Sequence, residues 1–521
     1  MKKIIFLSYL FAAFSTKVKA QFANIIIDST HAPEEVSICI NPKNSSQIAA
    51  GANIKNYYFS QDTGKTWQHD YLHSKNGVWG DPCLLADSSG NFYFVHLSYP
   101  FMGNWIDRIV CQKSIDGGKE YDNGTYTGLN GKKNQDKAWG AIDMTNSIYK
   151  NNIYLTWTQF DKYASTNKQD SSVILFSRSN DAGKTWTYPH RISEQAGDCL
   201  DGDSTDEGAV PCVGPTGQVY VAWAGPLGLV FNKSYDAGKT WLPHEKIISD
   251  IPGGWDYDIS GIDRSNGLPI TACDVSNSIY RGTIYVNWTD QRNGNTDTDV
   301  WIVKSSDGGE TWSSPIRVNN DKPSKQQFFT WMTIDQSNGN VYCIFYDRRE
   351  HGGDTTDVYM ARSTDGGNTF SNFKINATSF VPDAATFFGD YIGLSVDNGI
   401  IRPIWMQLNK GHLTIFTALM NDNMLGLPNI QNKFSAVELP QKNSDTDIVD
   451  FSFELPEDDS VNLDVKTIFG KKIIHLYQNK FLEKGKHEFV FNAKKYFLKQ
   501  GVYLISLSSK NTNIQKKIVI L

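Results

Sequence analysis

Residues 177–186 read SRSNDAGKTW, and near copies of this phrase recur along the chain. The six versions occupy residues 60–67, 114–121, 179–186, 234–241, 305–312 and 363–370. Glycine supplies the positive φ of a tight turn, aspartate accepts hydrogen bonds from the N–H groups of the turn, and the aromatic residue folds back over a sheet. Each phrase is therefore predicted to be the loop of a β-hairpin.

A second recurring phrase lies upstream of these loops, and it consists of an apolar strand, a turn and a strand rich in Tyr and Trp. Clear examples are residues 81–98, 207–225, 268–292 and 329–349. Together with the two strands that flank each loop, this gives four strands per repeat, which is typical of a propeller blade. We expect an all-β fold with seven blades, or six if the first or last unit is degenerate. Residues 23–30 are expected to supply a closing strand to the last blade.

The hairpin phrase resembles the Asp box, or BNR repeat, of the sialidase-like β-propellers, over about residues 35–420. These loops join the third strand of a blade to the fourth, on the face opposite to the start of the first strand. Binding sites of propellers usually occupy that other face, around the axis. The box aspartates are therefore expected to be structural, and they are Asp62, Asp116, Asp181, Asp236, Asp307 and Asp365.

The sequence changes character at both ends. Residues 1–20 combine lysines, an apolar stretch and Val-Lys-Ala, which predicts a secretory signal peptide. We expect the propeller over residues 21–425, a polar linker over 426–445, and a small antiparallel β-sandwich over 446–521. The order IFGKKI, GKHEF, LKQGVYLISL, KKIVIL in the tail resembles the sorting domain of the type IX secretion system of Bacteroidetes. That resemblance implies export by the type IX machinery, then release or attachment at the outer-membrane cell surface.

Composition excludes several partners and cofactors. A formal net charge of −6 without a long basic run argues against nucleic acid. After the signal peptide no apolar stretch is long enough to span a bilayer, so no transmembrane segment is expected in the mature chain. The seven cysteines include no CxxC pair, and they are expected to be buried thiols without a metal. No cofactor is expected, with a structural calcium ion at Asp297 and Asp299 as the alternative.

Carboxylates, arginines and aromatic residues gather where first strands begin and second strands end. The first group is Trp79, Asp81, Asp136, Lys137, Trp139, Asp206, Glu207, Trp331, Asp390 and Tyr391. The second group is Asp161, Asp290, Arg292, Asp347, Arg348, Arg349, Glu350 and His351. Such a mixture suits an anionic sugar, although members of these groups can also pair with one another as salt bridges.

The resemblance to sialidases implies roles for some of these residues. That family uses a Tyr nucleophile assisted by a Glu, an Asp as acid and base, and three arginines that clamp the substrate carboxylate. Tyr391 in GDYIGLS (389–395) matches the Tyr, Glu207 is its expected partner, and Asp81 is the candidate acid and base. The expected substrate contacts are Arg292, Arg348, Arg349, Asp390, Trp139 and Trp331.

The leading prediction is a secreted or cell-surface sialidase-like glycoside hydrolase that acts on acidic sugars. The early Arg-Ile-Pro motif that supplies one clamp arginine in that family is absent, which keeps a non-catalytic glycan-binding, protein-binding or adhesion propeller open. A polysaccharide lyase is the second alternative, because propellers also host β-elimination by Tyr and His. His96 and His351 are the histidines expected near the functional face.

Overall fold

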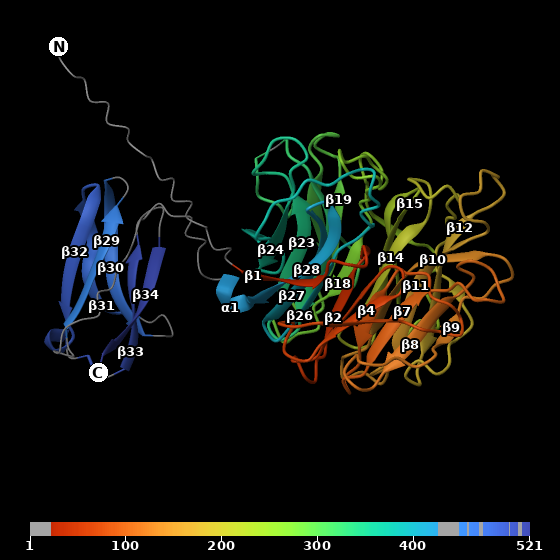
Figure 1. Cartoon of the computed structure of the whole chain (residues 1–521), viewed down its shortest axis with the longest axis horizontal. Coiled ribbons are helices and arrows are strands. Elements are labelled where there is room, and N and C mark those ends of the chain that lie inside the picture. The colour runs from red at the N-terminus through yellow and green to blue at the C-terminus, as the bar shows by residue number, and fades with distance from the viewer. Residues whose placement is uncertain are drawn as a thin grey trace, which may run out of the picture. The chain divides into compact units, whose positions relative to one another are not determined.

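The computed structural model describes residues 22–425 except residue 323, and residues 448–520 except 456–457, 468–471, 497, 500 and 509–512. The predicted signal peptide and linker lie outside the described residues. The chain divides into two compact units after Asp422, and many of their strands are labelled in Figure 1.

The larger unit consists of four-stranded antiparallel sheets, of which the described residues form seven. Blade 1 comprises β2 (Ser37–Ile40), β3 (Ile48–Ala52), β4 (Asn56–Ser60) and β5 (Gln68–Tyr71). Blade 2 comprises β6 (Cys83–Ala86), β7 (Phe92–Leu97), β8 (Ile109–Ser114) and β9 (Thr125–Thr127). Blade 3 comprises β10 (Asn134–Ile142), β11 (Ile153–Phe160), β12 (Ser172–Ser179) and β13 (His190–Arg191).

The next three blades repeat the same order of strands. Blade 4 comprises β14 (Glu207–Val213), β15 (Val219–Gly225), β16 (Gly228–Ser234) and β17 (Lys246–Ser249). Blade 5 comprises β18 (Ile270–Cys273), β19 (Ile284–Asp290), β20 (Asp299–Ser305) and β21 (Ile316–Arg317). Blade 6 comprises β22 (Gln327–Asp335), β23 (Asn340–Asp347), β24 (Asp357–Ser363) and β25 (Ser371–Lys374).

Blade 7 joins the two ends of the unit. It comprises β26 (Gly393–Asp397), β27 (Ile400–Asn409), β28 (His412–Asn421) and, as its outermost strand, the N-terminal β1 (Ala23–Asp28). Figure 1 shows β1, in red, beside the blue β28. The first strand of every blade contacts the first strand of the next, and β26 contacts β2, so the blades form a closed ring. The predicted propeller and the predicted closing strand are confirmed.

Large apolar side chains fill the space between the blades. A tryptophan recurs near the end of the second strand in four blades, and each of these side chains is fully buried: Trp157, Trp223, Trp288 and Trp405. Side chains point alternately to the two faces of a strand, and at this position they point into the packing between sheets. A large aromatic side chain buries more surface there than any other residue would. The seven cysteines are free thiols, and all except Cys39 are fully buried.

The box at residues 179–186 shows how the hairpin phrase works. Asp181 Oδ1 accepts hydrogen bonds from the N–H groups of Lys184 (3.1 Å) and Thr185 (2.9 Å) and from the Ser179 hydroxyl (2.7 Å). Burial opposes ionisation, but hydrogen bonds from Thr185 and Ser179 outweigh it and lower the pKa of Asp181 to about 2. The other boxes are capped in the same way by Asp62, Asp116, Asp236, Asp307 and Asp365.

Replacing Asp181 with Ala tests the structural role of the box. We expect the substitution to lower the free energy of unfolding by about 1 kcal/mol, as for other lost caps, because two N–H groups and two hydroxyls lose their acceptor. Groups at the start of β10 should be unaffected, since the box lies at the opposite end of the sheet. Urea unfolding followed by tryptophan fluorescence measures the loss, and unchanged stability would contradict the structural assignment.

The smaller unit holds two antiparallel sheets. One pairs β29 (Ile448–Leu455) with β32 (Gly485–Asn492). The other has the order β31 (Lys472–Leu482), β30 (Asp459–Thr467), β33 (Gly501–Ser508) and β34 (Asn513–Ile520). Its helical elements are α1 (Asp422–Leu425), which begins at the unit boundary, and the short η1 (Lys494–Tyr496). A buried cluster that includes Phe453, Leu463 and Ile505 packs between strands of the two sheets, in agreement with the predicted sandwich.

Candidate active site

The start of the first strand lies opposite the Asp box in each blade. In blade 3, Ser179 aligns with Ile153 and Ile153 with Ile142, whereas Asp136 aligns with Thr158 at the other end of the sheet. The register of β10 shifts between Asp136 and Trp139, and equivalent shifts occur in β14 and β22. Such bulges re-aim side chains, and here they do so at the face of the propeller remote from the boxes.

Charged residues at this face adopt a backbone conformation that side chains rarely favour. Glu35, Asp81 and Lys137 have φ angles of 50°, 52° and 44°. A residue held in this left-handed region costs about 1–3 kcal/mol, and such strain concentrates at functional sites. These residues lie at the starts of blades 1, 2 and 3, so the same departure from strand geometry occurs three times around the axis.

One half of the site is a buried ion-pair network around Asp390. Lys137 Nζ lies 2.6 Å from Asp390 Oδ2, and Arg264 Nε donates to Asp390 Oδ1 at 2.9 Å. Arg264 also contacts Asp201, at 3.4 Å. The side chain of Arg264 is 40% exposed whereas that of Asp390 is 2% exposed, so the network runs from solvent to the buried end of blade 7.

The other half of the site is organised by Asn53. Its Oδ1 accepts a hydrogen bond from the Asp81 N–H at 2.8 Å, and its Nδ2 donates to the Glu35 carboxylate. A side chain at Gly80 would overlap Asn53, because a Cβ atom there would lie 2.3 Å from Asn53 Oδ1. Asn53 therefore holds the first residues of blades 1 and 2 beside each other.

Several buried polar atoms at this face have no hydrogen-bond partner among the described residues. They are Tyr391 Oη, both carboxylate oxygens of Glu207, Asp81 Oδ2 and Glu34 Oε2. Tyr391 is 7% exposed, Asp81 8% and Glu207 fully buried. Leaving such a group unpaired costs about 1–3 kcal/mol, more if it is charged. Their concentration at one place indicates a site that is completed by a ligand or by water.

The environment separates the pKa values of the carboxyl groups. Burial and the Asp81 charge raise the pKa of Asp136 to about 7, against the opposing effect of Lys137. Burial, Asp81 and Asp390 also raise the pKa of Glu35 well above its usual range. Burial opposes ionisation of Asp390 too, but the charges of Lys137 and Arg264 outweigh it and lower its pKa to about 2. Acids and bases with such divergent pKa values are what acid–base catalysis requires.

The raised pKa values of Asp136 and Glu34 predict how the free energy of unfolding depends on pH. Burial raises the pKa of Asp136 to about 7 and, with Asp81 and Asp390, that of Glu34 to about 8, whereas unfolded carboxyl groups titrate near about 4. Above about pH 5 the folded chain thus holds protons that the unfolded chain has released, so the free energy of unfolding falls as pH rises to about 8. The lowered pKa of Asp390 acts in the opposite direction, and only below about pH 4.

We expect the free energy of unfolding to fall by at least about 2 kcal/mol between about pH 5.5 and about pH 8, since one retained proton contributes about 1.4 kcal/mol per pH unit. Urea unfolding at the two pH values measures it. Asp136→Asn, which is neutral at both, should reduce the difference. Higher stability at the upper pH, or an unchanged difference in the variant, would contradict these shifts.

An aromatic layer lies next to the charged groups at the axis. The ring of Trp139 lies 4.6 Å from that of Trp331 and 4.9 Å from that of Tyr391, between centroids. A cavity of about 20 Å³ beside Lys137, Asp390 and Tyr391 has room for about one water molecule.

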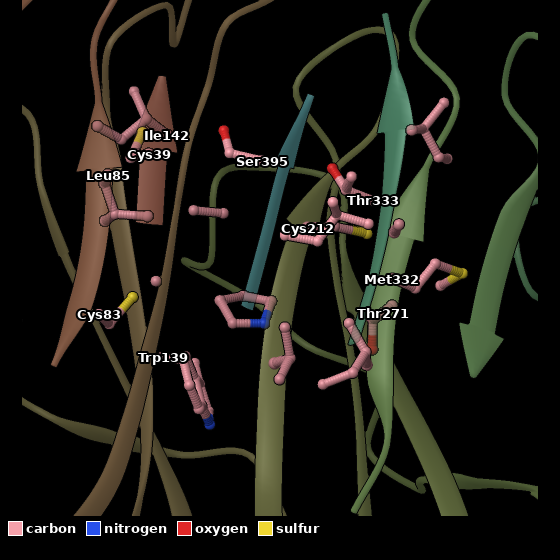
Figure 2. Close-up of a pocket in the computed structure, with 18 of the residues that line it drawn as sticks. Cys39, Cys83, Leu85, Trp139, Ile142, Cys212, Thr271, Met332, Thr333 and Ser395 are labelled. Atoms are coloured by element: carbon pink, nitrogen blue, oxygen red, sulfur yellow. The ribbon is translucent and has the colours of Figure 1, made fainter. Parts of the chain in front are cut away.

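A larger cavity of about 320 Å³ is lined by the first strands of all seven blades. Figure 2 shows Cys39, Cys83, Cys212 and Ser395 around it, with Trp139 at one end. Burial raises the pKa of both Cys39 and Cys83 to about 12, so these thiols stay protonated. The axial cavity is therefore an uncharged channel, and the acid–base groups lie at the end that Trp139 occupies.

The structure brings together eight of the residues predicted at strand starts: Asp81, Asp136, Lys137, Trp139, Glu207, Trp331, Asp390 and Tyr391. Glu207 forms an ion pair with Lys137, at 3.9 Å, and the charges that act most on Tyr391 come from Asp81, Glu35 and Asp390. The Tyr391 hydroxyl has no hydrogen-bond partner among the described residues, so the pairing of Glu207 with Tyr391 stays a prediction.

The three predicted clamp arginines contact acceptors in blades 5 and 6 and in the segments between blades. Arg292 forms an ion pair with Asp290 and stacks on Trp301, with its guanidinium carbon 4.7 Å from the ring centroid. Arg349 pairs with Asp347 at 2.7 Å. Arg348 donates to Ser260 O at 2.6 Å and to Gln326 at 2.9 Å. These contacts correspond to the salt-bridge alternative, and a role of the three residues in substrate binding stays a prediction.

Other predicted positions are likewise tied to protein partners. Asp161 pairs with Lys133 at 2.6 Å, and Tyr359 donates to Glu350 at 3.2 Å. Trp79 packs against Tyr99 and Trp105. Buried Asp206 has one oxygen without a partner among the described residues, and its backbone N–H donates to Ser172.

The histidines and the proposed calcium ligands are also engaged. His96 is buried between Leu97 O (2.7 Å) and Gln112 (3.0 Å), and His351 contacts Asp357 at 2.8 Å. Asp299 accepts from Asn319 at 2.6 Å, and Asp297 from the Ser324 N–H at 2.7 Å. Calcium at these two aspartates remains an untested prediction.

Five residues of the site were missed in the sequence: Glu34, Glu35, Asn53, Asp201 and Arg264. Asn53 lies between β3 and β4 of blade 1, and the other four lie in connections between blades, where no repeat marks them. The only sequence signal was the pair of adjacent glutamates directly before the first strand of blade 1.

Comparisons with known proteins identify the C-terminal part. Residues 443–521 match the family model of the secretion system C-terminal sorting domain. The tail is a sorting domain. The predicted resemblance is thus confirmed, and the sorting domain directs the protein to secretion or to attachment at the cell surface. Among the described residues, no helix has the length and apolar character needed to cross a membrane.

The solved structures that resemble the propeller share little sequence with it. No curated protein matches the chain by sequence. Among solved structures, the Hadza microbial sialidase Hz136 is 14% identical, with 73% of this chain and 75% of that chain covered and a TM-score of 0.41. An ulvan lyase bound to its substrate is 10% identical (77% and 96% covered, TM-score 0.43), and the NanB sialidase of Streptococcus pneumoniae is 9% identical (76% and 94%, TM-score 0.41). These structural neighbours are glycoside hydrolases and a polysaccharide lyase, and the likeness concerns the fold alone.

Proposed function

We propose that the propeller is a glycoside hydrolase whose chemistry takes place at the axis around Tyr391. The observation that carries this proposal is the buried Tyr391 hydroxyl, which has no hydrogen-bond partner among the described residues and lies among carboxyl groups with opposed pKa values. Glycosidic cleavage needs an acid for the leaving oxygen and a nucleophile for the anomeric carbon. The site offers both within one cluster.

In the proposed reaction, Glu35 is the acid, because burial and Asp81 keep its pKa well above the usual range and hence its carboxyl protonated. Glu35 gives its proton to the glycosidic oxygen as the bond from that oxygen to the anomeric carbon breaks. Tyr391 Oη attacks the carbon and passes its own proton to Asp81. Burial and nearby carboxylates raise the pKa of Tyr391, so the phenol needs this base.

The second half of the reaction restores the residues. Water attacks the anomeric carbon of the tyrosyl sugar and gives a proton to Glu35, while Asp81 returns its proton to the departing Tyr391 oxygen. Lys137 and Arg264 act as positioning residues, because both contact Asp390, the residue before Tyr391.

The charges favour a neutral or cationic sugar over the acidic sugar expected from the sequence. Both cations near Tyr391 are already bound to Asp390, and the surrounding groups are carboxyls. A sugar carboxylate placed there would meet like charges rather than a free guanidinium.

The test is to incubate the purified protein with neutral, amino-containing and sialylated oligosaccharides and to measure new reducing ends. We expect release from neutral or amino-containing substrates, and sialylated ones to be cleaved most slowly. Products that absorb in the near ultraviolet would instead identify a lyase. Absence of cleavage in all three classes would contradict the proposal.

A binding module is the second candidate, and one observation favours it. The cavity beside Tyr391 measures about 20 Å³, too small to bring a sugar ring into contact with the Tyr391 hydroxyl. Retention of an oligosaccharide on a glycan array without any product would support this reading.

A further inference from the structure

We propose that Asp28, His31 and His69 form a binding site for a divalent first-row transition metal ion at the seam where the ring closes. Asp28 ends β1, the outermost strand of blade 7, and His69 lies in β5, the outermost strand of blade 1. One potential ligand atom from each of the three residues lies within 4.8 Å of the others. Among the described residues, this is the one such group of three.

Asp28 is held in place for such a role. The side chain is buried, its Oδ1 accepts from the Thr30 N–H at 2.8 Å, and its Oδ2 accepts from the Tyr58 hydroxyl at 2.7 Å. The same Oδ2 lies 2.7 Å from His31 Nδ1. Asp28 Oδ1 also accepts from the Thr30 hydroxyl at 2.9 Å. Tyr58 belongs to β4 of blade 1, so Asp28 is already fixed across the seam, and the lone pair of Oδ2 that now faces His31 Nδ1 is the one that a cation would use.

The hydrogen bonds of His69 select a tautomer that can ligate. Its Nε2 lies 3.0 Å from Asn56 Oδ1, and Asn56 Nδ2 donates to Asn53 O at 2.6 Å, which leaves the amide oxygen of Asn56 facing the ring. His69 Nε2 therefore carries the proton, and Nδ1 carries the free lone pair. A metal-ligating histidine usually donates its other N–H to such an acceptor, which fixes the ring orientation.

Two imidazoles and one carboxylate define the class of ion. Nitrogen-rich sets of this kind suit zinc and its neighbours in the first transition row, whereas calcium and magnesium prefer oxygen ligands alone. The His31 and His69 rings are stacked, with centroids 4.1 Å apart and planes 20° apart. Binding would turn the exposed His31 ring toward His69 Nδ1 and replace the proton between His31 and Asp28.

A bound metal ion would therefore link the first blade to the last. An ion that binds the closed ring but not the unfolded chain stabilises the closed ring by mass action. Asn56 links His69 to Asn53 by hydrogen bonds, but none of the three proposed ligands takes part in the proposed reaction at Tyr391, so zinc binding is measured independently of the hydrolase activity.

The test uses the intact mature protein after treatment with a chelator. Titration with zinc chloride in a calorimeter should show one equivalent bound, accompanied by a rise in Tm that the chelator reverses. His69→Ala and His31→Ala should each weaken zinc binding by at least about tenfold, in line with the loss of a ligand. His244→Ala is the matched control, because His244 is exposed and contacts only the single carboxylate of Glu194 among the described residues, at 3.0 Å.

Zinc affinity that is unchanged in both variants, or that falls equally in His244→Ala, would overturn the proposal. So would binding of calcium chloride at this site as tight as that of zinc chloride. If the alanine variants unfold, His69→Gln, which keeps a polar side chain without an imidazole, supplies the same comparison.

Discussion

Tyr391→Phe should abolish most glycan turnover while leaving the fold unchanged. A nucleophile or acid–base group contributes about 10²–10⁴-fold to rate, and we expect a loss of about 10³-fold in kcat/KM. Stability should stay within about 0.5 kcal/mol, because the Tyr391 hydroxyl has no protein partner to lose among the described residues. Initial rates on the best oligosaccharide, together with urea unfolding, measure both quantities.

Tyr93→Phe is the matched control for this variant. Tyr93 is also buried, but its hydroxyl donates to Asp87 at 2.8 Å. Its loss should cost about 1 kcal/mol of stability and no activity. Equal activity losses in the two variants would show that Tyr391 acts only through packing.

Asp390→Asn should be among the most destabilising single substitutions in the propeller. The Asp390 side chain is 2% exposed and holds both Lys137 and Arg264. Removing one partner of a buried ion pair costs about 3–5 kcal/mol, because the remaining charge is left buried. Urea unfolding at about pH 7 measures the difference, where Asp390 is ionised because its pKa is lowered to about 2.

The comparison for this prediction is Asp161→Asn. Asp161 pairs with Lys133 at 2.6 Å, but both side chains are partly exposed, at 27% and 39%. Exposed ion pairs contribute about 0–1 kcal/mol, so the expected loss is small. If Asp390→Asn costs no more than Asp161→Asn, the network around Asp390 does not support the site.

The repeats made the fold and one face of the site predictable. Asp136 and Glu207 occupy equivalent places at the starts of their blades, each directly before the register shift of the first strand, so their meeting at the axis follows from the symmetry of the ring. The strand at Ala23–Asp28 was also predictable, because the last blade needed a fourth strand and this stretch could supply it.

The connections between blades escaped prediction for a physical reason. Arg264 and Asp201 lie in connections whose paths are set by packing over the ring, and neither position is repeated in another blade. The contacts of two predicted arginines were also not foreseen: Arg292 and Arg349 follow an aspartate by two residues, and that local pair engages the guanidinium within its own turn. Charge counting along the sequence does not distinguish a paired arginine from a free one.

The most direct test of the central claim is a crystal structure of Tyr391→Phe with a bound oligosaccharide from the best substrate class. The account predicts a sugar at the axial face, with its anomeric carbon next to position 391 and its glycosidic oxygen within hydrogen-bond distance of Glu35. A sugar bound instead on the face of the Asp boxes, with the groups around position 391 untouched, would contradict it.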